Sequence, residues 1–197
     1  IRTFAEYATD YQKEKYLKKL LNGEMVIGLG MTEPNAGSAV TDLTTKAVQD
    51  GKGFRVSGSK VFTSNSPDAD IFLIYVRYHE GINGIGSVIM DTSMPGFSKG
   101  KSSKYTNGEE WCALYFDNVY IAEENVLLGP GGFKKQISGF NAERIGNSAR
   151  SLALGEFAFN VAKEYALTRE QFGKKICEFQ GIPVSYTHLR AHETRFY

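Results

Sequence analysis

The stretch Gly28-Leu29-Gly30-Met31-Thr32-Glu33-Pro34-Asn35-Ala36-Gly37-Ser38 joins a short apolar run to a sharply turning loop. Pro34 restricts its own φ angle and favours an extended backbone at Glu33. Asn35 and Gly37 adopt positive φ angles at low cost. The spacing therefore predicts a rigid loop whose backbone N–H groups face outward, which suits a ligand rich in carbonyl and phosphate oxygens. A plain surface turn between two strands is the alternative.

The composition is that of an ordinary globular protein, with room for one domain or two small ones. The chain has 197 residues, of which 42% are hydrophobic and 23% charged. Its 23 Lys and Arg residues nearly balance 22 Asp and Glu residues, which argues against a dedicated nucleic-acid-binding protein. Cys112 and Cys177 lie far apart without a CxxC motif, so neither a disulfide framework nor a zinc site is indicated. No apolar run has the length of a membrane span.

The chain changes character near residue 24 and again near residue 129. Apolar residues recur near helical spacing over residues 4–21, and Asn22-Gly23 is a typical helix end. Short runs of Val, Ile, Phe and Tyr follow, with hairpin turns predicted at Asp50-Gly51 and Asn83-Gly84. Strands are predicted at residues 25–30, 41–48, 54–63, 71–77, 86–91, 113–116 and 119–121. This pattern indicates an α+β protein with a central, mainly antiparallel β-domain of barrel or sandwich type.

A long helix is predicted from about Phe133 to Leu167, because apolar residues share one broad face. Such a helix needs partner helices, which indicates a longer chain or an oligomer. After Ile182 the helical pattern is lost, and we expect a frayed end. His188 and His192 have the spacing of two metal ligands, but no motif places a third, so no metal site is predicted. Because the chain begins at Ile1 rather than Met, we expect an internal piece of a longer protein.

The opening stretch resembles the flavin-binding signature of the acyl-CoA dehydrogenase family, apolar-x-Thr-Glu-Pro-x-Ala-Gly-Ser-Asp, and departs from it at Ala39. Leu29 stands where some relatives have an aromatic residue. Further segments resemble the family in order and spacing. They are Ser57-Gly58-Ser59-Lys60-Val61-Phe62-Thr63-Ser64-Asn65, Phe116-Asp117-Asn118-Val119 with Asn125-Val126-Leu127-Leu128-Gly129, Gly132-Phe133, Glu143-Arg144, Arg169-Glu170-Gln171-Phe172-Gly173-Lys174 and Phe179-Gln180.

The resemblance implies a helical N-terminal domain, a central β-domain and a C-terminal helical bundle. In this chain it places the end of the first domain at residues 1–23, the β-domain at 24–128 and the start of the bundle at 129–182. Residues 183–197 do not follow the family pattern, and we interpret them as a non-family tail. This division contains only the start of the bundle. We therefore expect the chain as it stands to be inactive.

The resemblance also implies an FAD site. Met31 and Thr32 match positions at the pyrimidine edge of the flavin, and Ser38 matches a hydroxyl group that reaches phosphate. Phe62 matches the aromatic residue packed against the isoalloxazine, and Ser64 matches the hydroxyl group near N5. From the residues alone, Phe62 would be a core residue and Ser64 a polar group at a strand end. The matched cofactor positions also include Leu29, Gly37 and Thr63.

Arg169 and Phe172 match residues that hold the adenine side of FAD from a neighbouring subunit, which implies a homodimer or homotetramer. The alternative for Arg169 is a cation favoured by a helix C-terminus. The family reaction removes a proton from the α-carbon of an acyl-CoA thioester and passes a hydride from the β-carbon to flavin N5. A carboxylate base with a raised pKa is required, and Glu143 matches the base of one subset of the family.

The substrate positions implied by the resemblance are Ser38, Asn141 and Arg144. Helix-surface ion pairs made by Glu143 and Arg144, or a base later in the longer chain, are the alternatives to a catalytic Glu143. The implied partners are an acyl-CoA substrate and an electron-transfer flavoprotein or similar acceptor, with no nucleic acid and no membrane. The implied compartment is the bacterial cytoplasm or the mitochondrial matrix. A non-catalytic binding β-domain, or a desulfinase or oxidase on the same fold, stays open.

Overall fold

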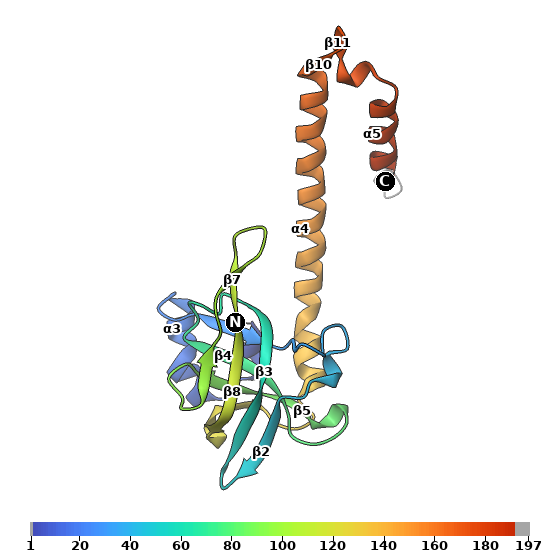
Figure 1. The fold of residues 1–197 in the computed structure, drawn as a ribbon. Helices are drawn as coiled ribbons and strands as arrows, with labels where there is room; N and C mark the ends of the chain where they lie inside the picture. Colours follow the sequence, from blue (N-terminus) through green and yellow to red (C-terminus); the bar gives the residue numbers. More distant parts are fainter. Residues whose placement is uncertain (1, 192–197) are drawn as a thin grey trace. The chain divides into compact units, whose positions relative to one another are not determined.

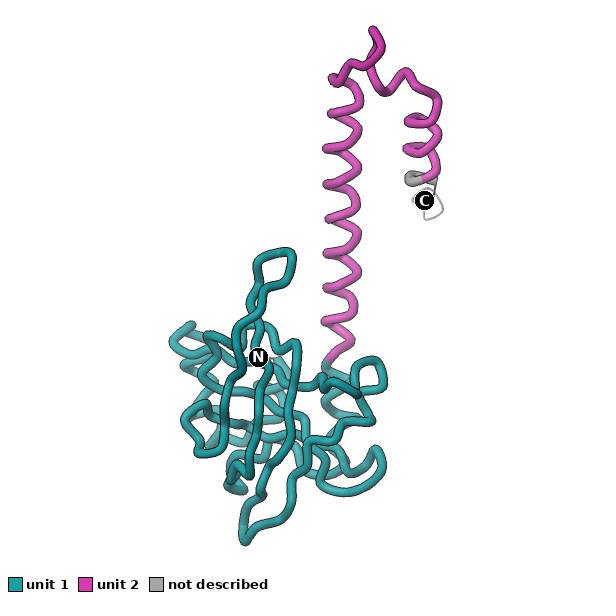
Figure 2. Tube along the Cα trace, in the orientation of Figure 1, with its two compact units in different colours: residues 1–139 teal, residues 140–197 magenta. Residues whose placement is uncertain are grey.

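The computed structural model describes residues 2–191, which belong to two compact units (Figures 1 and 2). Unit 1 extends to Gly139 and holds the N-terminal helices, the main sheet and the first turns of a long helix. Unit 2 begins at Phe140 and holds the rest of that helix, a small hairpin and a final helix.

The N-terminal segment is helical, as predicted. It consists of α1 (Arg2–Tyr7), α2 (Asp10–Gln12), a π-helical turn η1 (Lys13–Leu17) and α3 (Lys18–Leu21). Thr9 begins α2 with a capping box, in which the Gln12 N–H donates to Thr9 Oγ1 and the Thr9 N–H donates to Gln12 Oε1. The segment ends before Gly23, which has a φ of +73° that Gly adopts readily.

Within residues 2–191, nine strands form one large sheet. They are β1 (Ile27–Gly30), β2 (Lys46–Asp50), β3 (Gly53–Ser64), β4 (Ile71–Arg77), β5 (Ile85–Asp91), β6 (Phe97–Lys99), β7 (Ser103–Lys104), β8 (Glu110–Ile121) and β9 (Val126–Leu128). Short 3₁₀ turns connect them at η2 (Val40–Asp42), η3 (Ile82–Gly84) and η4 (Glu123–Asn125). Both predicted hairpin turns are confirmed, since β2 pairs with β3 and β4 pairs with β5 in antiparallel fashion.

The strand order is β6-β8-β3-β2-β4-β5-β9, with β1 beside β4 and β7 beside β8. This order has two ends, so the barrel-like closure expected from the sequence is not confirmed. The sheet is also mixed, because β1 and β2 both run parallel to β4. Parallel neighbours need a crossover connection, and here the chain leaves β1, forms the loop and the β2–β3 hairpin, and only then returns through β4.

Two strand boundaries differ from the prediction for local reasons. The segment predicted as a strand at 41–48 begins pairing only at Lys46, because Thr44 and Thr45 bind a buried carboxylate instead. The two short strands predicted at 113–116 and 119–121 are one strand, β8. A bulge at Asn118, with a φ of +55°, interrupts the pairing with β3 without ending the strand.

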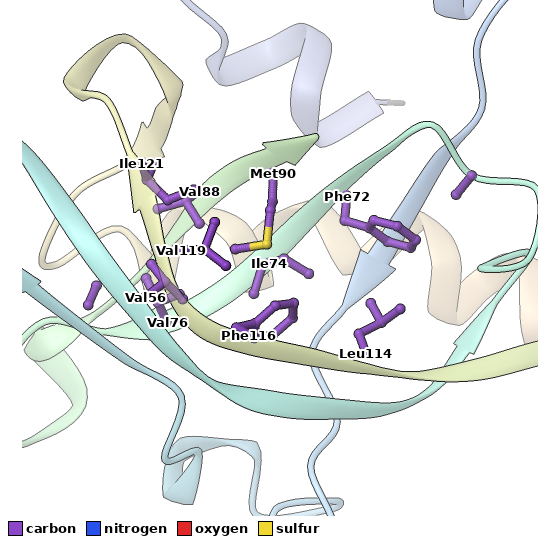
Figure 3. Packing of buried hydrophobic residues seen from close by; sticks show 12 residues of the cluster. Val56, Phe72, Ile74, Val76, Val88, Met90, Leu114, Phe116, Val119 and Ile121 are labelled. Carbon is purple, nitrogen blue, oxygen red and sulfur yellow. The ribbon is translucent and has the colours of Figure 1, made fainter. Parts of the chain in front are cut away.

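Strand β4 lies at the centre of the packing and buries both of its faces. Phe72, Ile74 and Val76 join the cluster drawn in Figure 3, together with side chains from β3, β5 and β8. Ile71 and Leu73 point to a second cluster that includes Phe4, Tyr16 and Leu20 of the N-terminal helices. The β-sheet therefore separates two hydrophobic cores within unit 1.

Helix α4 (Phe133–Thr168) agrees with the predicted long helix. It is followed by the hairpin β10 (Glu170–Gln171) and β11 (Lys174–Lys175), the turn η5 (Ile176–Glu178) and α5 (Gly181–Ala191). The expectation of a frayed end after Ile182 is wrong as far as Ala191, because α5 is helical there. His188 lies on α5, whereas His192 lies outside the described residues.

Beyond residue 140, α4 exposes most of its apolar side chains within unit 2. The exposed large residues are Ile145, Leu152, Leu154, Phe157, Val161, Tyr165 and Leu167. A helix with so little buried surface gains little stability from packing.

Candidate functional site

The loop after β1 is a tight turn, as its sequence predicts, but neither Asn35 nor Gly37 has a positive φ angle, and two of its N–H groups bond within the turn instead of facing outward. The Glu33 N–H donates to the Ala36 carbonyl and the Ala36 N–H donates to the Glu33 carbonyl, both at 3.1 Å. These reciprocal bonds close the Glu33-Pro34-Asn35-Ala36 segment on itself. Gly37 and Ser38 follow on the exposed side of the turn.

A buried ion pair holds this turn from below. Glu33 is 5% exposed and Lys60 of β3 is 0% exposed, and the Lys60 Nζ lies 2.8 Å from Glu33 Oε1. The same carboxylate accepts bonds from the hydroxyl and backbone N–H groups of both Thr44 and Thr45, at 2.6–2.9 Å. Both oxygens are therefore satisfied, which is the condition under which a protein interior tolerates a charge.

The environment shifts both pKa values of this pair. Burial raises the pKa of the Glu33 carboxyl, but the Lys60 ammonium and the bonds from Thr45 and Thr44 outweigh burial and lower that pKa to about 2. Burial also lowers the pKa of Lys60, to about 8, against the opposing attraction of Glu33. Both groups are therefore charged at neutral pH.

Two further bonds place the start of the loop against β3. The Lys60 Nζ donates to the Met31 carbonyl at 3.1 Å, and the Val61 N–H donates to the Thr32 carbonyl at 2.9 Å. Met31 and Thr32 are half-buried there. Val61, which bonds to Thr32, is the residue directly before Phe62 in β3. The structure thus brings together two motifs that the sequence analysis identified separately.

Phe62 sits in a β-bulge and faces outward. Lys60 pairs with Leu114 and Thr63 pairs with Cys112, so two residues of β3 oppose one residue of β8. Phe62 has a φ of +56°, an unusual angle for an aromatic residue that costs about 1–3 kcal/mol. Its side chain is 56% exposed, so the interpretation of Phe62 as a core residue is wrong.

The other predicted residues near this surface differ in exposure. Ser64 is exposed at the end of β3, and Leu29 is exposed on β1. Thr63 points the other way along the strand and is only 1% exposed, and its Oγ1 has no hydrogen-bond partner within residues 2–191. Its side chain therefore does not share the outer surface with Phe62 and Ser64.

In unit 2, the predicted residues of α4 are all exposed. The Arg144 Nη1 donates to Asn141 Oδ1 at 2.7 Å, a contact between residues three positions apart on the helix. Among the described residues, neither Glu143 nor Arg144 forms a salt bridge, so the alternative of helix-surface ion pairs at these residues is not confirmed. The Glu143 carboxylate is free to meet a ligand or another element.

The β10–β11 hairpin presents an aromatic residue at its tip. Gln171 pairs with Lys174, so Phe172 and Gly173 form a two-residue turn with φ angles of +52° and +75°. Phe172 is 94% exposed, and its ring lies 6.3 Å from that of Phe179. Arg169 is exposed at the base of the same hairpin, one residue after α4 ends.

The described part of the chain shows no candidate metal centre. Residues 2–191 contain no group of three or more His, Cys, Asp or Glu side chains placed to hold a metal ion. Over the same residues, no helix has the length and apolar character needed to cross a membrane.

Two family models match most of the chain. The model described as "Acyl-CoA dehydrogenase, middle domain" matches residues 28–119, and "Acyl-CoA dehydrogenase, C-terminal domain" matches residues 130–194. The chain belongs to the acyl-CoA dehydrogenase family. The middle-domain match includes the Glu33–Lys60 pair and Phe62, and the C-terminal match includes Glu143 and the β10–β11 hairpin.

Individual acyl-CoA dehydrogenases are similar along nearly the whole chain. The mitochondrial isovaleryl-CoA dehydrogenase of Oryza sativa subsp. japonica is 34% identical over 206 residues, covering 100% of this chain and 50% of the relative. The structure of butyryl-CoA dehydrogenase from Megasphaera elsdenii has a TM-score of 0.85 at 32% identity, covering 96% of this chain and 51% of that chain. A solved chain described as the electron transferring flavoprotein of Acidaminococcus fermentans has a TM-score of 0.84 at 31% identity, covering 98% and 53%.

The chain spans about half the length of the curated relatives that it matches. The division into domains at residues 23, 128 and 182 stays a prediction. The resemblance to the acyl-CoA dehydrogenase family that the motifs indicate is confirmed.

Several residues that shape this site carry little local sequence signal. Lys60 belongs to the motif that runs from Ser57 to Asn65, but its partner Glu33 is distant in the sequence, so local patterns do not predict the pair. Thr44 and Thr45 were interpreted as strand residues. The signal for Trp111, described below, is weaker still, because it contacts Phe62 only across two paired strands.

Proposed function

We propose that this chain contributes the flavin-binding part of an enzyme that introduces a double bond between the α- and β-carbons of an acyl-CoA thioester. The observation that carries the proposal is the joining of two motifs at one surface. The Glu33–Lys60 pair ties Met31 and Thr32 to the strand that carries Phe62 and Ser64. A flat exposed ring beside hydroxyl groups is what the face and polar edge of an isoalloxazine require.

The residues present fit FAD, which supplies an acceptor for the hydride when it is bound. In this proposal Phe62 covers the ring face, and Thr32, Met31 and Ser64 bond to its polar edge. Ser38 donates to phosphate from the outer side of the turn. Leu29, Gly37 and Thr63 contribute to the same wall, Thr63 through its backbone because its side chain is buried.

Arg169 and Phe172 serve the cofactor of a neighbouring copy in this proposal. Both are exposed, and Phe172 stands at the tip of a turn held by the pairing of β10 and β11. A guanidinium forms paired, charge-assisted bonds with phosphate, and an exposed ring can stack on a base. The proposal therefore implies a homodimer or homotetramer.

We assign Glu143 as the base that removes the α-proton, with Arg144, Asn141 and Ser38 contacting the substrate. The isovaleryl-CoA dehydrogenase similarity supports this choice, because the resemblance places the base of such enzymes at this position. Glu143 is exposed in this chain, so in this proposal the substrate and elements that cover α4 shield it from water. A base from a later segment is the competing assignment.

The electron acceptor in this proposal is an electron-transfer flavoprotein or a similar protein, as the family resemblance implies. The reaction would take place in the bacterial cytoplasm or the mitochondrial matrix. We also propose that the 197-residue chain alone does not turn over substrate. An oxidase or desulfinase variant would use the same flavin wall, since one site supports different chemistry.

Flavin binding separates this proposal from a non-catalytic binding domain. The 197-residue chain would be titrated with FAD and followed by flavin absorbance and fluorescence. Wild type is expected to bind FAD, and Phe62→Ala is expected to weaken binding about tenfold by removing the ring contact. Tyr115→Ala, at another exposed aromatic position of β8, is the matched control. Failure of wild type to bind FAD would support the non-catalytic alternative.

The role of Glu143 is tested in the full-length protein that contains this chain. Glu143→Gln keeps the shape of the side chain but removes the base, and is expected to lower α-proton exchange of an acyl-CoA by a factor of at least about 10². Glu156→Gln, on the exposed surface of the same helix, is expected to exchange like wild type. Unchanged exchange in Glu143→Gln would assign the base to another residue.

A further inference from the structure

Three aromatic rings meet at the bulge that carries Phe62. The ring centroids of Phe62 and Trp111 are 4.7 Å apart with an interplanar angle of 49°. The rings of Trp111 and Tyr105 are nearly parallel, at 6.2 Å and 28°. Such distances lie within the range of favourable aromatic contacts. The motifs of the sequence do not explain this cluster, because only Phe62 belongs to one of them.

Backbone and hairpin contacts fix the three rings relative to one another. Trp111 pairs with Ser64 across β3 and β8, next to the bulge. The Tyr105 hydroxyl donates to the Phe62 carbonyl at 3.3 Å. The hairpin that carries Tyr105 is closed by the pairing of Lys104 with Glu110 and by the bond from the Tyr105 N–H to the Glu109 carbonyl.

The bulge explains why Phe62 needs support. A φ of +56° is unfavourable for a residue with a side chain, so surrounding contacts must hold it. On one side, the Val61 N–H bonds to the Thr32 carbonyl. On the other side, Trp111 contacts the ring of Phe62 and Tyr105 holds its carbonyl. Phe62 is more than half exposed, so few other contacts remain to orient the ring.

We propose that Trp111, assisted by Tyr105, is a positioning residue that sets the orientation of the Phe62 ring toward a planar heteroaromatic ligand. This inference rests on the proposed function for the identity of that ligand, an isoalloxazine. Trp111 acts through Phe62 and through the geometry of the bulge. The cluster holds the strained, exposed Phe62 side chain in one orientation.

The test uses the 197-residue chain and two readouts, one of which needs no flavin. The first is the χ1 angle of Phe62, measured by NMR scalar couplings and assigned by comparison with Phe62→Leu, because loss of the Trp111 ring current alone would shift the Phe62 resonances. The second is the affinity for FAD. Trp111→Leu removes the ring and keeps an apolar side chain, Trp111→Phe keeps a ring, and Tyr115→Leu removes an exposed aromatic residue of the same strand.

Trp111→Leu is expected to change the χ1 angle of Phe62 and to weaken FAD binding about tenfold. Trp111→Phe is expected to retain wild-type affinity within about threefold, and Tyr115→Leu to change neither readout. Tyr105→Phe, which removes only the hydroxyl group bonded to Phe62, is expected to shift the Phe62 backbone resonances. It keeps the inference testable if Trp111→Leu does not fold.

The outcomes separate the two proposals. If the Phe62 χ1 angle and the FAD affinity of Trp111→Leu equal those of wild type, the positioning role is overturned. If Trp111→Leu does not fold and Tyr105→Phe leaves the Phe62 backbone resonances unchanged, the role is likewise overturned. If wild type does not bind FAD but the Phe62 χ1 angle changes in Trp111→Leu, the positioning role stands and the proposed function fails for this chain.

Discussion

At the scale of single residues, the Glu33–Lys60 pair has the largest influence on the candidate site. An ion pair with both side chains at 0–4% exposure is costly to form, because two charges leave water. Four bonds from Thr44 and Thr45 compensate on the Glu33 side. The pair therefore specifies where the loop lies rather than adding much net stability.

The acid dependence of stability follows from the pKa of Glu33. This pKa is lowered from 4.5 to about 2, so the stabilisation is complete above pH 4.5 and is lost as the pH falls toward 2. We expect the free energy of unfolding to fall by about 3 kcal/mol more in this window than in a variant without the pair. Urea unfolding at several pH values, followed by Trp111 fluorescence, measures this. An equal pH dependence in Glu33→Gln/Lys60→Met would contradict it.

Breaking the pair from one side gives a second prediction. Lys60→Met leaves the Glu33 carboxylate buried without its cation, which should cost about 3–5 kcal/mol of unfolding free energy. Lys104→Met breaks an ion pair of the same 2.8 Å length, with Glu110, whose side chains are 69% and 38% exposed. That variant should lose much less unfolding free energy than Lys60→Met, because solvent screens the exposed pair. Urea denaturation midpoints of the two variants measure both losses of unfolding free energy. Similar losses in the two variants would refute the prediction.

At the scale of elements, the bulges of the β3–β8 pair shape the part of the sheet next to the site. Asn118 has a φ of +55° in one bulge, and Phe62 has a φ of +56° in the other. Asn tolerates this angle, which gives the Phe116-Asp117-Asn118-Val119 motif a physical meaning. The motif permits one continuous strand to change its register against β3.

Substitutions at the Asn118 bulge should have opposite effects at adjacent positions. Asn118→Gly relieves the backbone and should be neutral or stabilising by up to about 1 kcal/mol, whereas Asn118→Val should destabilise by about 1–2 kcal/mol. Asp117→Gly, at the exposed neighbour without a positive φ, should destabilise by about 0.5–1 kcal/mol. Thermal unfolding of the three variants checks the signs. A stabilising Asn118→Val would show that the bulge is not the determinant.

At the scale of the whole molecule, unit 1 and unit 2 differ in how much they bury. Six consecutive residues of β4 and six of β5 are buried, whereas α4 beyond residue 140 exposes its large apolar side chains. Helices in water depend on tertiary packing for most of their stability. Each unit should therefore respond differently to dilution and to denaturant.

Hydrogen exchange should reveal this difference directly. In the dilute 197-residue chain, amide groups of β4 and β5 should be the most protected, and those of α4 between residues 140 and 168 should exchange by local opening, at least about 10²-fold faster. Exchange in α4 should slow at higher concentration if copies of the chain cover its apolar side chains. Equal protection of α4 and β4 in the dilute chain would contradict the prediction.

Much of the fold could be predicted because its signals are local. Helix α4 from Phe133, the two hairpin turns and most strands follow from periodicity and turn residues, which depend on near neighbours in the chain. The turning loop at Thr32-Glu33-Pro34 follows from the same local rules. The resemblance to the family rests on ordered motifs, so it too is readable without coordinates.

The sequence by itself determined the kinds of elements, the turning loop and the family. Only the tertiary structure decided that β1 runs parallel to β4, that Lys60 neutralises Glu33, and that Phe62 turns outward against Trp111. Strand alternation does not state which strand is the neighbour, and a charge is buried only where a distant partner satisfies it. Local chemistry therefore predicts that the loop turns, whereas the position of the loop beside β3 depends on contacts between residues far apart in the chain.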